Sequence, residues 1–180
     1  MDELIDVLDE SGNKTGVVKN KLDVKKAGDW HRAISVCIVN NNFEILMHQR
    51  SSKKTIFPSL WSLFVKGHVA SKENSIETCI RECYEELGIK LEKTDLKYLH
   101  TLKDKDSNPK LDFINNIFYD NYIVFKDIKL EDVVMQEDEV AQIKYMYFSD
   151  VEKLIKCNDL TLVPNYKEYK ILLEYLNKLK

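Results

Sequence analysis

The chain has 180 residues, a formal net charge of −3 and 44% hydrophobic residues, a composition that supports one domain with a sizeable core. A mildly acidic chain is not expected to bind nucleic acid without sequence preference, because such binders are usually basic. No apolar run approaches the roughly 18 residues of a membrane span, and the acidic start lacks the features of a secretory signal. The four cysteines show no zinc-ligand spacing, and a chain of this length needs no disulfide framework, so we expect reduced thiols and a cytoplasmic location.

In chain order, the pattern first predicts a β-hairpin over residues 4–19, with a turn at Glu10–Asn13. Further strands are predicted at residues 33–39, 43–49, 61–65, 96–102, 114–125 and 143–148. Polar loops are predicted at residues 51–54 and 103–110, and helices at residues 75–87, 151–155 and 166–179. Strands mixed with a few helices favour an α/β (α+β) layered fold, and no linker divides the chain, so we expect a single domain over residues 1–180.

The segment Ser75–Leu87 has helical periodicity, and Gly88 is expected to end the helix as its C-cap. One apolar stripe comprises Ile76, Cys79, Ile80, Cys83 and Leu87. Glu82, Glu85 and Glu86 lie roughly 120–180° from this stripe. There the three like charges repel one another and oppose the helix dipole. The acidic face is either simply solvated or a site for a hard cation such as Mg²⁺, which prefers oxygen ligands.

Three further residues near this helix fit either a site or an ordinary fold. Gly67 follows a predicted strand, where a missing side chain permits close approach of a ligand or simply makes a turn. Glu73 is expected to cap the helix entrance, where a negative charge is favoured. Arg81 is the only cation in the carboxylate segment, and it can orient carboxylates through bidentate hydrogen bonds or form a surface ion pair.

Together these residues match the Nudix box, written G-x5-E-x7-R-E-U-x-E-E-x-G-U, in which U is a bulky apolar residue. Residues 67–89 carry every fixed position, and Cys83 takes one apolar position as a small hydrophobe. The chain therefore resembles the Nudix family. Four flanking segments resemble the branch related to isopentenyl-diphosphate isomerase: Trp30–Ala33, Gln49–Lys54, Pro58–Trp61 and Gly67–His68. The resemblance covers residues 3–155 and implies the Nudix fold, a mixed β-sheet sandwiched between α-helices.

The resemblance implies hydrolysis of a nucleoside diphosphate linked to another group, with Mg²⁺ or Mn²⁺ bridging the phosphates and water attacking phosphorus. By the same resemblance the metal ligands are Glu82, Glu85 and Glu86, with the carbonyl of Gly67. Glu73 and Gly88 take structural roles in the box, and Arg81 together with Glu73 would orient the ligands.

The catalytic residues implied by the resemblance are Arg81, Glu82, Glu85 and Glu139. The general base is expected in the segment Met135–Val140, before the last predicted strand of the sheet. Glu139 is preferred there because it lies six residues before Tyr145, which takes a place often held by tryptophan in the family that the chain resembles. Glu137 and Glu82 are the alternative bases, and a solvated acidic loop is the interpretation without a catalytic role.

Substrate contacts are less specific. Arg50 and Lys54 resemble diphosphate-contacting positions of the isomerase branch, and their charges fit phosphate recognition, although solvated loop cations are equally expected. Trp61, Phe64 and Tyr119 are candidates to stack on a base, but aromatic residues at strand spacing are more often core residues. The expected partner is a small-molecule diphosphate of open identity, with no nucleic acid and no membrane, and a homodimer is the prior for a soluble enzyme.

The main alternative activity is the isomerase reaction. It would require a cysteine directly before the box glycine, where this chain has Lys66. It would also require carboxylates in a later segment that matches Phe113–Phe118, which contains none. The proton-transfer groups are thus missing while the hydrolytic box is complete. A non-catalytic nucleotide-binding module is the third hypothesis.

Overall fold

The computed structural model describes residues 3–108 and 113–179 of the chain. The strands are β1 (Leu4–Leu8), β2 (Lys14–Asn20), β3 (Trp30–Val39), β4 (Glu44–Arg50), β5 (Trp61–Ser62), β6 (Val65–His68), β7 (Leu96–Asn108), β8 (Phe113–Phe125) and β9 (Val140–Tyr147). The helices are α1 (Lys21–Ala27), α2 (Ser75–Leu87), α3 (Phe148–Lys156) and α4 (Tyr166–Asn177), with short 3₁₀ turns η1 (Lys93–Asp95) and η2 (Leu130–Asp132). Within this part of the chain, no helix is long and apolar enough to cross a membrane.

The strands form one mixed sheet organised around β3. β3 pairs antiparallel with β1, β4 and β6, and parallel with β8 along its whole length, from Trp30 opposite Asn116 to Val39 opposite Phe125. β7 extends the sheet beyond β8, while β5 and β9 both pair with β4. The predicted α/β class with a mixed sheet is therefore confirmed.

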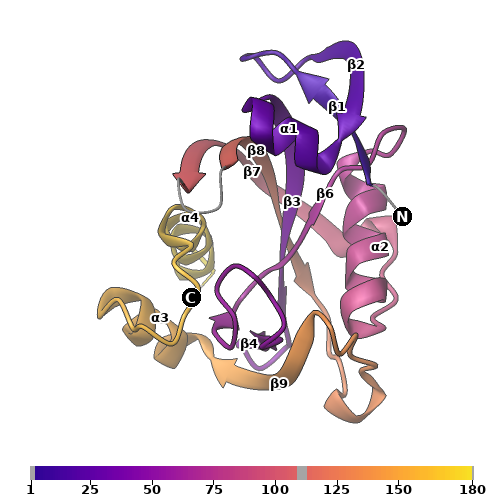
Figure 1. The fold of residues 1–180 in the computed structure, drawn as a ribbon. Helices are drawn as coiled ribbons and strands as arrows, with labels where there is room; N and C mark the ends of the chain where they lie inside the picture. Colours follow the sequence, from indigo (N-terminus) through magenta and orange to yellow (C-terminus); the bar gives the residue numbers. More distant parts are fainter. Residues whose placement is uncertain (1–2, 109–112, 180) are drawn as a thin grey trace.

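Helices cover both faces of the sheet, as Figure 1 shows with α2 on one side and α3 and α4 on the other. Alternate residues of β3 serve the two faces, as strand geometry requires. Ile34, Val36 and Ile38 join the core cluster that contains the buried face of α2. Cys37 and Val39 join the cluster formed with α3 and α4. The sheet thus fixes α2 rigidly on one side, and α2 is the helix that carries the box carboxylates.

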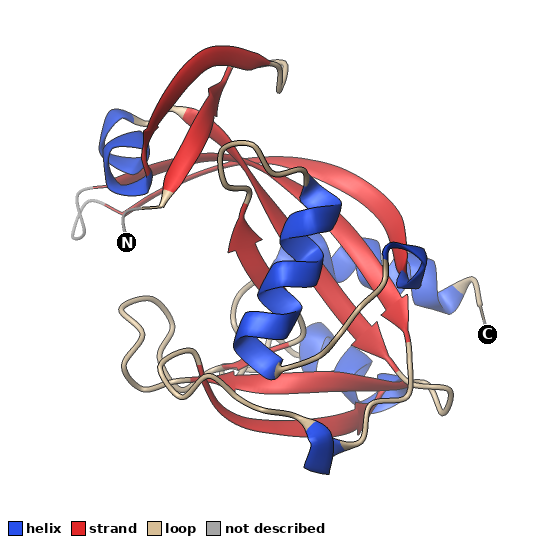
Figure 2. Ribbon diagram, turned by 90° about the vertical axis from the view of Figure 1, so that its right-hand side faces the viewer, coloured by secondary structure: helices blue, strands red, loops and turns tan. Residues whose placement is uncertain are grey.

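Helix α2 begins at Ser75 and ends at Leu87, as the sequence predicts. Figure 2 shows the blue helices lying against the red strands of the sheet. Asn74 is its N-cap and forms a capping box with Glu77, and Gly88 ends it in the left-handed conformation with φ of 67°. The predicted apolar stripe faces the core: Cys79, Cys83 and Leu87 are buried, and Ile76 and Ile80 pack against the same cluster.

Two predictions of secondary structure are corrected, and one helix was missed. The loop expected at residues 103–110 is wrong for residues 103–108, which continue β7 because each has a partner on β8; residues 109 and 110 lie outside the described residues. The strand expected at residues 61–65 is two strands, since the Ser62 hydroxyl hydrogen-bonds both the N–H and the C=O of Phe64 and bends the chain. Helix α1 was not predicted at all.

Candidate active site

A cavity of about 670 Å³ opens beside α2 and collects nearly every residue that the sequence nominated. Its walls come from α1, β6, α2, the loop after β4 and the loop before β9. The nominated residues that line it are Arg50, Lys54, Gly67, Arg81, Glu82, Glu85, Glu86 and Glu139. Residues far apart in sequence therefore meet at one place, between the last turns of α2 and two loops.

Gly67 lies on β6, and its missing side chain makes room for a carboxylate. A Cβ atom built at residue 67 would lie 2.1 Å from both Cδ and Oε1 of Glu82. Its φ is not in the left-handed region, so the glycine is required for close approach rather than for a turn. The group that lies close to Gly67 is therefore the carboxylate of Glu82, a residue of the box.

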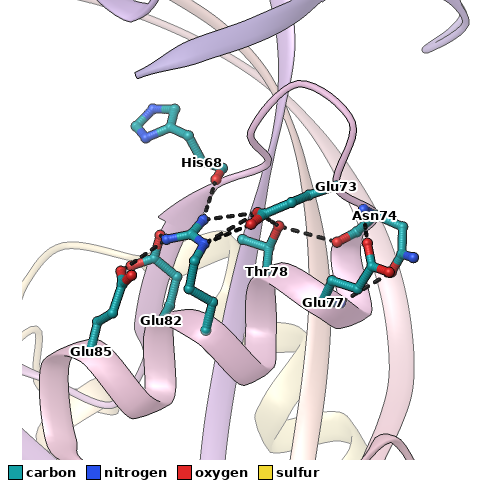
Figure 3. Close-up of polar contacts among 8 residues, drawn as sticks. His68, Glu73, Asn74, Glu77, Thr78, Glu82 and Glu85 are labelled. Carbon is teal, nitrogen blue, oxygen red and sulfur yellow. Dashed lines mark hydrogen bonds and ion pairs between the residues drawn. The ribbon is translucent and has the colours of Figure 1, made fainter. Parts of the chain in front are cut away.

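Arg81 connects the loop before α2 to two of the box carboxylates (Figure 3). Its Nε donates to both carboxylate oxygens of Glu73 at 3.0 and 3.2 Å. Its Nη1 donates to Oε1 of Glu82 at 2.7 Å and to Oε2 of Glu85 at 3.0 Å, and its Nη2 reaches the carbonyl of His68 at 3.3 Å. Burial of the guanidinium tends to lower the pKa of Arg81. The hydrogen bonds to Glu73 and the negative charge of Glu82 outweigh burial and raise this pKa.

The expected helix-capping role of Glu73 is wrong, because Asn74 provides the cap. The Glu73 carboxylate instead accepts hydrogen bonds from Arg81 and from the hydroxyl of Thr78 at 2.9 Å. Burial tends to raise its pKa, but these bonds outweigh burial and lower it. Glu73 is thus held as an anion that fixes the guanidinium of Arg81.

The box glutamates differ in exposure. Burial is the main cause that raises the pKa of Glu82 to about 7, and the negative charge of Glu85 adds to this shift. Burial likewise raises the pKa of Glu86 to about 8, and the charges of Glu82 and Glu139 add to it. The side chain of Glu85 is half exposed. The site therefore buries carboxylates side by side, an arrangement that is costly without a compensating cation.

The donor set fits a divalent cation by its chemistry. Mg²⁺ prefers carboxylate and carbonyl oxygens, and this cavity offers both from α2 and β6. Among the residues that the structure describes, no three acidic, histidine or cysteine side chains are already gathered into a metal cluster. Glu82 and Glu85 are hydrogen-bonded to Arg81 instead, and an arriving cation would compete for the same oxygens.

The predicted substrate and base residues line the same cavity. The guanidinium of Arg50 donates to the carbonyls of Ile56 and Phe57, so it holds the loop after β4 in place while lining the cavity. Lys54 forms an ion pair with the carboxylate of Glu139. Glu137 does not line this cavity, so the geometry favours Glu139 over its neighbour.

Several cavity residues were missed by the sequence reasoning: Glu3, Lys21, Lys25, Lys53, Lys66 and Gln136. Lys21 and Lys25 lie on α1, whose ends carry a recognisable signal. Asn20 caps the helix through its side chain, and Gly28 ends it with φ of 69°. The pair Asn20 and Gly28, eight residues apart, could therefore have predicted a lysine-rich helix before β3.

Two of the three aromatic candidates for base stacking, Trp61 and Phe64, do not lie where they could stack on a ligand in this cavity. Phe64 is buried and stacks on Tyr169 in the core, with ring centroids 5.8 Å apart. The ring of Trp61 lies under the ammonium group of Lys144 at 4.0 Å, and that of Tyr119 under Lys66 at 4.3 Å. Neither Trp61 nor Phe64 lines the cavity beside α2.

Comparison with known proteins shows which family this chain is related to. Residues 29–168 match the model of the NUDIX domain. Nudix hydrolase 3 of Arabidopsis thaliana is 34% identical over 91% of this chain, which spans only 22% of the length of that relative. Isopentenyl-diphosphate Delta-isomerase 1 of Photorhabdus laumondii is 27% identical over 92% of both chains.

A solved structure shares the fold. The crystal structure of DR0079 from Deinococcus radiodurans superposes with a TM-score of 0.71 at 17% identity, covering 93% of this chain and 98% of that one. The family match extends over most of the chain and includes the complete box on β6 and α2. The chain therefore belongs to the Nudix family.

Proposed function

We propose that this protein is a Mg²⁺-dependent hydrolase that cleaves the diphosphate linkage of a nucleoside diphosphate derivative. The observation that carries the proposal is the composition of one cavity: Glu82, Glu85 and Glu86 line it from α2, together with Arg50 and Lys54 from the end of β4 and the loop after it. Carboxylates that suit a divalent cation thus lie within one cavity with cations that suit phosphate oxygens.

The residues that would hold Mg²⁺ are Glu82, Glu85 and Glu86, with the carbonyl oxygen of Gly67; Mn²⁺ offers similar chemistry. When bound, the ion would offset the negative charge of the diphosphate. Arg81 and Glu73 act as positioning residues, because the guanidinium is fixed by Glu73 and in turn orients Glu82 and Glu85.

The hydrolytic step needs a group to accept a proton from water. Glu139 lines the cavity and is our preferred base, with Glu82 as the alternative. As water adds to one phosphorus, one of its protons passes to the carboxylate, and the bond from that phosphorus to the bridging oxygen breaks. The second phosphate-containing product leaves with the bridging oxygen and the electron pair of that bond. Lys54, which pairs with Glu139, lies where it can also contact a phosphate oxygen.

Gly88 contributes by allowing the loop before β9 to dock on the end of α2. A Cβ atom at residue 88 would lie 3.0 Å from Cβ of Val134, and Val134 donates its N–H to the carbonyl of Leu87 at 3.1 Å. Gln136 in the same loop donates to the carbonyl of Glu86 at 2.9 Å. These contacts bring Glu139 to the cavity that the box glutamates line.

Two alternatives remain distinct hypotheses. The isomerase reaction is suggested by the similarity to the Photorhabdus enzyme, but the residue before the box glycine is Lys66, which is ion-paired with Glu168 and offers no thiol. A non-catalytic nucleotide-binding module would need no glutamates for a metal, and all of them are present.

The test is release of phosphate or a nucleotide from a panel of nucleoside diphosphates, nucleotide sugars and ADP-ribose, with and without Mg²⁺. We expect Mg²⁺-dependent cleavage that Glu85→Gln reduces at least about 100-fold. Glu174→Gln, at an exposed position of α4, is the matched control and should keep full activity. If nothing is cleaved and Glu85→Gln leaves nucleotide affinity unchanged, the proposal is wrong. Formation of dimethylallyl diphosphate from isopentenyl diphosphate would favour the isomerase instead.

We also propose that residues 1–180 form a single domain, since β1 and β9 belong to one sheet and α4 packs into its core. Cys37, Cys79 and Cys83 are free and buried, which supports a reducing, cytoplasmic location. A homodimer remains the prior expectation for its assembly.

A further inference from the structure

A second cavity of about 650 Å³ adjoins the first. The two share Lys25, Thr55, Ile56, Lys66 and His68, so a ligand in one can extend into the other. The remaining walls come from β7, β8 and the start of α4, away from the box glutamates. A diphosphate bound near α2 would therefore direct one of its substituents into this second space.

Lys66 lies at the junction and is held by three partners. Its Nζ donates to Oδ1 of Asn165 at 3.1 Å and forms an ion pair with Glu168, whose side chain is only 6% exposed. It also lies 4.3 Å from the ring centroid of Tyr119. A hydrocarbon group in this space would cover a charged pair and an amide without giving them any hydrogen bond, which is unfavourable.

Two of the four lysines that line the second cavity are paired with its two carboxylates. Lys66 pairs with Glu168, and Lys167 pairs with Asp104. Lys105 extends over the ring of Trp30, with Nζ 5.2 Å from the ring centroid. The lining as a whole holds four lysines and two carboxylates, so the cavity combines hydrogen-bonding groups with a positive net charge, and a polar ligand fits it better than a hydrocarbon.

Two amide side chains of this cavity have an atom without a partner. Among the described residues, Nδ2 of Asn165 and Oδ1 of Asn115 are buried and make no hydrogen bond. The first is a donor and the second an acceptor. Buried groups of this kind are usually satisfied, so an unpaired donor and acceptor around one cavity favour a ligand that carries both.

We propose that the second cavity binds the group attached to the diphosphate, and that it selects a hydroxyl- or amide-bearing group, such as a sugar or nucleoside, over a hydrocarbon. Lys66, Asn165 and Glu168 are the residues that determine this specificity. The inference rests on the proposed function, because the diphosphate must lie beside α2 for its substituent to reach this space.

The experiment compares three probes that share a diphosphate: ADP-ribose, geranyl diphosphate and methyl diphosphate. For each we would measure kcat/KM and, separately, the dissociation constant by calorimetry. The wild-type protein should prefer ADP-ribose to geranyl diphosphate by at least about tenfold in both quantities.

Asn165 makes no helix-capping hydrogen bond, so Asn165→Leu should leave α4 intact. Asn165→Leu should weaken ADP-ribose binding about fivefold or more, while weakening methyl diphosphate binding less. Lys170→Ala, at an exposed position of α4 outside both cavities, is the matched control and should change neither ratio. Equal losses for ADP-ribose and methyl diphosphate, or a wild-type preference for geranyl diphosphate, would overturn the inference. If none of the probes is cleaved, the proposed hydrolase function fails, but the calorimetric ratios still decide whether the cavity selects a polar group.

Discussion

The carboxylate of Glu82 lies directly against the backbone of Gly67, in the space that a side chain at residue 67 would occupy. The strand β6 and the helix α2 can therefore approach one another closely only where the strand carries a glycine. This contact sets the depth at which Glu82 is buried. Two positions of the box, 15 residues apart by their numbers, thus form one structural unit.

We predict that Gly67→Ala greatly reduces hydrolysis with a modest effect on stability. The new Cβ would push the Glu82 carboxylate out of its place, and a displacement of about 1 Å in an active site can cost about 100-fold in rate. Mg²⁺ affinity should fall as well, because Glu82 is a proposed ligand. Steady-state kinetics and a Mg²⁺ titration measure both effects.

Gly16→Ala is the contrasting control for that variant. Gly16 has φ of 86° and no atom within 4 Å of a built Cβ, so alanine there meets backbone strain but no neighbour. Its free energy of unfolding should fall by about 1 kcal/mol with kcat unchanged. Wild-type activity in Gly67→Ala would contradict the role given to this close approach.

Arg81→Lys should reduce kcat more than it reduces substrate affinity. The guanidinium reaches Glu73, Glu82 and Glu85 at once, and a lysine cannot reproduce that planar, forked geometry. We expect a loss of about 1–3 kcal/mol in the free energy of unfolding, since buried carboxylate oxygens lose their donors. The measurements are thermal denaturation, kcat and the dissociation constant of the substrate. Unchanged values of all three would show that Arg81 is only a surface cation.

Glu139→Gln tests the general base. If Glu139 accepts the proton from water, kcat should fall about 100-fold or more while the fold stays intact. Glu137→Gln changes a neighbouring exposed glutamate that does not line the cavity, and it should retain wild-type activity. A full loss in Glu82→Gln together with near-normal kcat in Glu139→Gln would assign the base to the box instead.

His48 makes the fold sensitive to acid. Burial, aided by the nearby charge of Arg50, lowers the pKa of this histidine to about 4 from its ordinary value of 6.5. The unfolded chain therefore binds a proton on His48 between pH 6.5 and pH 4, where the folded protein does not. The stabilising contribution is complete above pH 6.5 and is lost as the pH falls towards 4, by up to about 3 kcal/mol at roughly 1.4 kcal/mol per pKa unit.

His48→Leu should make this part of the stability profile less steep without flattening it, because burial also lowers the pKa values of His31 and His68. The measurement is the free energy of unfolding from denaturant titrations between pH 4 and 7.5. His100→Gln replaces an exposed histidine and should leave the slope as in the wild type. An unchanged slope in His48→Leu would show that the acid sensitivity originates elsewhere.

Local patterns in the sequence were sufficient where a signal lies within one element. The periodicity of Ile76, Cys79 and Cys83 and the cap at Gly88 determined α2, because helix faces and caps depend on residues three or four positions apart. The same local order identified the box and, through it, the fold. Local order was insufficient for residues 103–108, whose charges suggest a loop but whose strand depends on pairing with distant β8.

The sequence by itself predicted which residues would carry the chemistry: the glutamates of α2, Arg81 and Gly67. Only the tertiary structure decided that Lys54 pairs with Glu139, that Glu73 holds Arg81 rather than capping the helix, and that Lys66 joins Glu168 at the junction of two cavities. The physical reason is the separation along the chain of the residues that interact. Helix faces and caps follow from near neighbours along the chain, whereas ion pairs and cavities form where the sheet brings together segments many residues apart.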